Sequence, residues 1–145
     1  SLQGENSTRY LYHDPCHAPM NSYNPVKVAS TLLGQDVLPS DRCCGESGTL
    51  GTARPDIAEQ LRYRKRQELQ QDLVQLTGET VTTQGKVKLL TSCPACQQGL
   101  SRYTDDTGLE TDFIVVELCN HNLGGNWQRE FVASANAGGI ERVLL

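Results

Sequence analysis

The stretch Arg42-Cys43-Cys44-Gly45-Glu46-Ser47-Gly48 places two adjacent cysteines directly before a glycine-rich segment. In a regular strand neighbouring side chains point to opposite faces, so two adjacent thiols reach one point only where the backbone turns sharply. Gly45 and Gly48 supply the conformational freedom for such a turn. We therefore interpret the chain as one that gathers thiols at a single place, the candidates being Cys16, Cys43, Cys44, Cys93 and Cys96.

Length and charge narrow the function classes. A chain of 145 residues fits one domain that buries enough surface to fold without disulfides. The formal net charge of −4 argues against a nucleic-acid-binding protein, whose surface is normally basic. No apolar run approaches the ~18 residues of a membrane span, and we see no secretory signal. We expect a cytoplasmic protein with reduced thiols, which could lie at the membrane periphery only through a larger parent protein.

Hydrophobic patterning and capping residues predict alternating strands and helices. The predicted strands are residues 9–13, 36–39, 86–91, 113–118 (nearly all apolar, and so expected to be central) and a short tail at 140–145. The predicted helices begin at Pro15, Asn24, Pro55, Gln97 and Asn126. This order predicts an α/β domain with a mostly parallel sheet of about four strands, helices on both faces and the cysteine loops at one sheet edge. Residues 1–8 are interpreted as a disordered lead-in or a linker remnant, and residues 9–145 as one domain from the C-terminal part of a larger protein.

Two cysteine segments have the same arrangement, with a proline and a cysteine directly after a predicted strand. Asp14-Pro15-Cys16 and Cys93-Pro94-Ala95-Cys96 each follow a predicted strand and are expected to open a helix at the proline. The positive end of a helix favours thiolate over thiol. The thiolates of Cys93 and Cys96 would stand one turn apart and could converge on one ion.

The chemistry of the clustered cysteines is compatible with three kinds of site. Five thiolates exceed the four that a tetrahedral zinc ion takes, and they suit an iron–sulfur cluster. A structural zinc site and a thiol–disulfide redox site remain as alternatives. Around the cluster, His13 and His17 are expected to hydrogen-bond to the ligands.

Other singled-out residues have plainer interpretations. Cys119 is expected to be a core cysteine at the end of a strand, and His121 an ordinary loop histidine. The basic segment at residues 62–66 is interpreted as a solvated or docking face of the long helix, whose apolar stripe is expected at Ile57, Leu61, Leu69, Leu73 and Leu76. Trp127 and Phe131 are expected to be core residues at helical spacing.

The motifs together resemble a known family. His13-Asp14-Pro15-Cys16-His17, Cys43-Cys44-Gly45 and Cys93-Pro94-Ala95-Cys96-Gln97-Gln98-Gly99 resemble the cysteine-rich CCG domain. That domain occurs in the B subunit of heterodisulfide reductase, the glycolate oxidase iron–sulfur subunit and related proteins. The continuation Gly45-Glu46-Ser47-Gly48-Thr49-Leu50 looks most like the version at the C-terminal end of large FAD-linked oxidases of the D-lactate dehydrogenase type.

The resemblance implies a function for the chain as part of a larger oxidoreductase. It implies a [4Fe–4S] cluster or zinc held by Cys16, Cys43, Cys44, Cys93 and Cys96. It also implies electron transfer in a FAD-linked 2-hydroxyacid oxidoreductase of the lactate or glycolate type. The flavin and further iron–sulfur domains would belong to the same parent chain or complex. No glycine-rich phosphate loop is present in this sequence, so FAD is expected on another domain, and this domain alone is not expected to be catalytically complete.

Overall fold

A computed structural model describes residues 8–16, 22–40, 43–45 and 50–138. The chain divides into two compact units, Ser1–Ile114 and Val115–Leu145. Each unit is described by itself.

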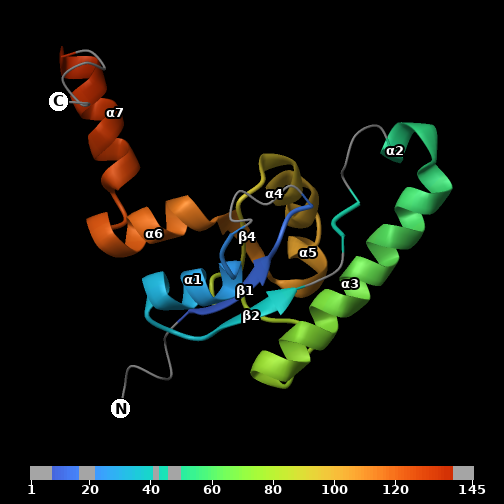
Figure 1. The fold of residues 1–145 in the computed structure, drawn as a ribbon. Helices are drawn as coiled ribbons and strands as arrows, with labels where there is room; N and C mark the ends of the chain where they lie inside the picture. The colour runs from blue at the N-terminus through green and yellow to red at the C-terminus, as the bar shows by residue number, and fades with distance from the viewer. Residues whose placement is uncertain (1–7, 17–21, 41–42, 46–49, 139–145) are drawn as a thin grey trace. The chain divides into compact units, whose positions relative to one another are not determined.

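The first unit is built on a sheet of four parallel strands, as the alternating pattern predicts (Figure 1). The strands are β1 (Arg9–His13), β2 (Val37–Ser40), β3 (Val87–Thr91) and β4 (Glu110–Phe113), in the order β2-β1-β3-β4. After β1 the chain adds β2 on one side, then crosses to place β3 on the other side of β1. Open α/β sheets bind ligands outside the carboxyl ends of the strands at such a switch point, here between β1 and β3.

Local signals explain the helices of this unit. They are α1 (Pro25–Leu33), α2 (Leu50–Ala53), α3 (Pro55–Thr77), α4 (Pro94–Ser101) and α5 (Thr104–Thr107). At the start of α1 the side chain of Asn24 accepts a hydrogen bond from the backbone N–H of Lys27, as expected of a cap. Gly34 and Gly78 end α1 and α3 in the left-handed conformation, which an L side chain adopts only at a cost.

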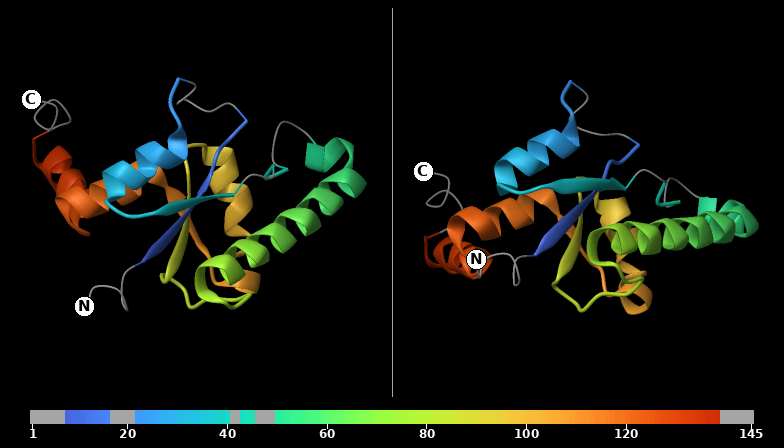
Figure 2. Two further views of the ribbon diagram at one scale, coloured as in Figure 1. Left: turned by 60° about the horizontal axis from the view of Figure 1, so that its bottom comes forward. Right: turned by 90° about the horizontal axis from the view of Figure 1, so that it is seen from below.

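The core lies between one face of the sheet and helices α3 and α4. Buried side chains of β1, β3, α3 and α4 pack there, among them Leu11, Leu69, Val87, Leu89 and Leu100. Helix α1 lies on the opposite side of the sheet (Figure 2) and buries Ala29 and Leu33. Helices therefore cover both faces, as predicted.

The buried stripe of α3 differs from the expected one. Its buried residues are Ala58, Lys65, Leu69 and Leu73, whereas Ile57 is 36% exposed. Leu69 and Leu73 were expected there, but the stripe continues toward the N-terminus through a lysine. Charged side chains are rarely buried unless they are paired, and Lys65 has buried partners described below.

The predicted strand at residues 113–118 is wrong. The strand β4 ends at Phe113 and helix α6 (Ile114–Leu123) begins at the next residue. Residues 110–113 form the strand instead, and it is an edge strand rather than a central one. A short apolar run cannot be assigned to strand or helix by its pattern alone, and Val115 is 64% exposed where a central strand would bury it.

The second unit contains the rest of α6 and helix α7 (Trp127–Gly138). The indole N–H of Trp127 donates to Asn120 Oδ1 over 2.8 Å. Helix α7 has no buried residue and Phe131 is 42% exposed, so the expectation that Trp127 and Phe131 are core residues is wrong. The predicted strand at 140–145 lies outside the described residues. Among the described helices none is both long and apolar enough to cross a membrane.

Candidate metal centre

The cysteine loops follow three neighbouring strands. Cys16 comes after β1, Cys43 and Cys44 after β2, and Cys93 and Cys96 after β3. Because the strands are parallel, their carboxyl ends meet at one edge of the sheet. The fold therefore gathers the segments that the sequence singled out. None of the six cysteines forms a disulfide.

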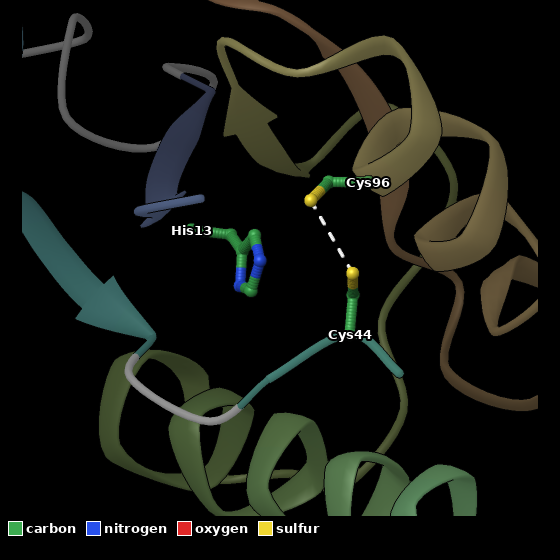
Figure 3. A group of neighbouring side chains, drawn as sticks. All are labelled: His13, Cys44 and Cys96. Atoms are coloured by element: carbon green, nitrogen blue, oxygen red, sulfur yellow. Dashed lines mark hydrogen bonds between the residues drawn. The ribbon is translucent and has the colours of Figure 1, made fainter. Parts of the chain in front are cut away.

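Cys44 and Cys96 form the buried centre of this group. Their sulfurs lie 3.3 Å apart, and their side chains are 5% and 6% exposed. One ring nitrogen of His13 and these two sulfurs all lie within 4.8 Å of one another. Figure 3 shows the imidazole of His13 at the end of β1, lying beside both sulfurs. Atoms this close could share one metal ion or cluster edge.

Cys16 and Cys43 lie on the exposed side of the group. The pKa of Cys16 is raised chiefly by the negative charge of Cys43, with burial, a hydrogen bond to Cys43 and the charge of Cys44 adding to the effect. One thiolate raises the pKa of another in this way only when the two groups lie close together. A bound cation would remove this repulsion, so the arrangement favours metal binding.

The turn at Gly45 sets the orientation of the adjacent residues Cys43 and Cys44. Gly45 has φ +77°, and its backbone N–H donates to Cys43 Sγ over 3.3 Å. This left-handed conformation is the sharp turn that the doublet requires. Because of it, Cys43 and Cys44 face the same group of thiols although they are neighbours in sequence.

Cys93 confirms one of the two predicted helix starts. It occupies the cap position of α4, and the backbone N–H of Cys96 lowers the pKa of Cys93. Burial, followed by the nearby Cys44, raises the pKa of Cys96. At the other site Cys16 lies in a turn and Pro15 is not helical, so no helix begins at Pro15.

The remaining candidates lie in α6 or outside the described residues. His17 is outside the described residues. Cys119 lies within α6 and is partly exposed, so the expectation of a core cysteine at a strand end is wrong. His121 lies in the last turn of the same helix rather than in a loop. The predicted ligand set of Cys16, Cys43, Cys44, Cys93 and Cys96 remains a prediction, with His13 and Gly45 beside it.

Sequence reasoning missed Lys65. Its side chain is fully buried, and its Nζ lies 2.8 Å from Ser40 Oγ, 3.1 Å from Glu68 Oε2 and 3.3 Å from His13 Nδ1. The available signal was spacing, because Lys65, Leu69 and Leu73 recur every four residues on one helix face. The basic segment at residues 62–66 is therefore not wholly a solvated face.

A buried hydroxyl tests whether the site fits a cofactor. Thr91 Oγ1 is buried and has no hydrogen-bond partner among the residues that the structure describes, and Thr91 pairs with His13 across β1 and β3. Paired residues of parallel strands lie on the same face, so the Thr91 side chain lies on the face of the sheet that carries His13. An unpaired buried hydroxyl is costly, and a bound thiolate or sulfide would be an acceptor for it. The thiols and this hydroxyl therefore fit a sulfur-ligated centre.

This chain is similar in sequence to known proteins. The B subunit of fumarate reductase (CoM/CoB) from Methanothermobacter marburgensis is 26% identical over 107 residues, which cover 70% of this chain and 19% of that protein. The uncharacterized iron–sulfur protein MMP1067 from Methanococcus maripaludis is 26% identical over 117 residues, covering 74% of this chain and 21% of that protein. The chain thus spans about a fifth of the length of these relatives. No solved structure matches.

Two family profiles divide the sequence. Residues 101–145 match a domain of unknown function, DUF3400. Residues 10–101 match the cysteine-rich domain, CCG, and they contain all five cysteines of the group. The chain therefore belongs to the cysteine-rich CCG domain family.

Proposed function

We propose that this chain binds an iron–sulfur cluster through Cys16, Cys43, Cys44, Cys93 and Cys96 and transfers electrons within a larger cytoplasmic oxidoreductase. The observation that carries the proposal is the convergence of these thiols, with the sulfurs of Cys44 and Cys96 3.3 Å apart. Thiolates are the normal ligands of iron–sulfur clusters. The names of the two relatives, a reductase subunit and an iron–sulfur protein, support the same function.

The finer form of the proposal concerns the cluster and its partners. The resemblance to the CCG domain favours a [4Fe–4S] cluster, which accepts one electron and releases it to an acceptor. We place FAD on another domain of the parent protein, where a 2-hydroxyacid of the lactate or glycolate type would be oxidised. Changing Cys43 and Cys44 to Ser in that parent should abolish reduction of the acceptor but spare reduction of the flavin. If acceptor reduction survives, the electron-relay role is wrong.

Anaerobic reconstitution with iron and sulfide tests cluster binding by the chain itself. We expect iron and acid-labile sulfide to bind in equal amounts, with broad visible absorption and a paramagnetic signal in one redox state. The buried Cys44→Ser should lose most of the bound iron. Cys119→Ser is the matched control, because Cys119 lies in the second unit, and it should bind as much iron as the wild type.

Two alternatives predict different results in the same experiment. A structural zinc site is favoured by the three mutually close ligand atoms of His13, Cys44 and Cys96, and it would give one colourless zinc ion per chain and no cluster. A thiol–disulfide site is favoured by the same 3.3 Å separation. There, Cys44 and Cys96 would join in a disulfide while a substrate disulfide is reduced to two thiols, and redox titration of a metal-free dithiol would reveal it.

A further inference from the structure

Thr91 carries a buried hydroxyl for which the described residues provide no hydrogen-bond partner. Its side chain is fully buried, and its Oγ1 makes no hydrogen bond within the described part of the chain. A buried hydroxyl without a partner lowers the stability of a protein. Valine has nearly the same shape and would fill this position without that cost, so packing alone does not explain the threonine.

Other threonines of the chain find an acceptor close by in the sequence. The hydroxyls of Thr31, Thr77 and Thr107 each donate to the backbone carbonyl four residues earlier in a helix. Thr91 is instead the last residue of β3 and pairs with β1 on one side and β4 on the other. A strand offers no carbonyl in the helical position, so an acceptor for Thr91 has to come from elsewhere.

The sheet face that carries Thr91 packs against the buried cysteines. Leu89, two residues earlier on this face, belongs to the same core as Cys44 and Cys96. At the carboxyl end of the face Thr91 pairs with His13, and neighbouring strands lie about 4.8 Å apart. One ring nitrogen of His13 is within 4.8 Å of both sulfurs (Figure 3). The Thr91 side chain is therefore a neighbour of the residue that lies beside these two thiols.

We infer that the Thr91 hydroxyl donates a hydrogen bond to a sulfur atom of the cluster that this chain binds. The inference rests on the proposed function, which supplies the cluster. A hydroxyl has a proton to donate, and sulfur accepts hydrogen bonds. Hydrogen bonds to the sulfurs set the reduction potential of a cluster, and a donor stabilises the reduced, more negative state. Thr91 would therefore raise the midpoint potential.

Unfolding of the metal-free chain in urea tests whether the hydroxyl lacks a partner in that state. Thr91→Val removes the hydroxyl and keeps the shape of the side chain. We expect the urea midpoint of the variant to equal or exceed that of the wild type, because an unpaired buried hydroxyl does not stabilise the fold. A lower midpoint would show that the hydroxyl already has a partner without the cluster, and it would overturn the inference.

Reconstitution with iron and sulfide, followed by redox titration, tests the hydrogen bond itself. Thr91→Val should bind iron at least about tenfold more weakly and should have a lower midpoint potential than the wild type. Thr91→Ser keeps the hydroxyl and should retain the wild-type potential. An unchanged potential in Thr91→Val, or an equally low potential in Thr91→Ser, would contradict the inferred role of the hydroxyl.

Thr111→Val is the matched control. The Oγ1 of Thr111 is also buried with no partner in the described part of the chain. Thr111 pairs with Leu89 rather than with the end of β3, and its strand precedes none of the five clustered cysteines. The control should behave like Thr91→Val in urea and like the wild type after reconstitution. Equally lowered potentials in both valine variants would overturn a specific role for Thr91.

The outcomes separate this inference from the proposed function. If the wild type and all variants bind no iron, the proposed function is wrong and the inference is wrong with it. If the wild type binds a cluster and Thr91→Val keeps the wild-type potential, the inference alone is wrong and the proposed function stands.

Discussion

Replacing Gly45 by alanine tests whether the turn after the cysteine pair creates the metal site. Gly45 has φ +77°, and an L residue in the left-handed region costs about 1–2 kcal/mol. The new Cβ would lie 3.5 Å from Leu61 Cβ, which is ordinary contact worth only ~0.1–0.2 kcal/mol per atom pair. Backbone strain therefore dominates, with no steric clash to confuse the result.

The strain should appear mainly in metal binding. In the metal-free chain the turn can relax, so the free energy of unfolding should fall by at most about 1–2 kcal/mol. Binding of zinc or a cluster requires Cys43 and Cys44 to face one point and so restores the strained turn. An affinity loss of 1–2 kcal/mol corresponds to roughly 5–30-fold. Zinc titration against a competing chelator measures this change.

Gly34→Ala is the matched control. Gly34 has φ +70° and no atom within 4 Å of the position that an added Cβ would take, and it ends α1 rather than a cysteine loop. Its backbone strain should also be about 1–2 kcal/mol, but all of it should appear as lower stability in denaturant. Equal losses of zinc affinity in both variants, or no loss in Gly45→Ala, would refute the idea that this turn aims the two thiols.

Three further predictions concern the scaffold and the boundary of the site. Gly108→Ala should destabilise the chain by more than about 3 kcal/mol in denaturant unfolding, because its Cβ would overlap the backbone oxygen of Thr82 and no side-chain rotation can relieve that. Leu69→Ala should cost about 2–5 kcal/mol, since Leu69 is fully buried in the core. Leu32→Ala, at a 51% exposed position, should stay within about 0.5 kcal/mol, and similar losses for both leucines would contradict the assigned core. Cys119→Ser should leave the midpoint potential of the reconstituted cluster unchanged, and a shifted potential would show that this thiol contributes to the centre.

The sequence was sufficient for features that depend on local chemistry. Backbone preferences that neighbouring residues do not override explain the helix cap at Asn24 and the helix ends at Gly34 and Gly78. The alternation of strands and helices required a parallel sheet, and a parallel sheet brings the ends of its strands to one edge. The gathering of the cysteine segments could therefore be predicted from the order of the elements.

Other features depended on neighbours that are distant in sequence. The apolar run at Ile114, Val115 and Val116 has strand-forming residues, yet it is helical, because a short run fits either element and only packing decides between them. The core expectations for Trp127 and Phe131 failed for a related reason. Helical spacing shows that two side chains share a face, but not that anything covers that face.

The candidate metal centre depends partly on local sequence patterns and partly on contacts between residues that are distant in the sequence. The sequence alone predicted that the cysteine segments would meet and that a glycine turn would follow the pair, since both depend on strand order and local turn geometry. Only the tertiary structure showed that Lys65 is buried against His13 Nδ1, because a lysine enters a core only when partners from other elements satisfy its charge. That contact joins residues 52 positions apart in the sequence, so no local pattern could predict it.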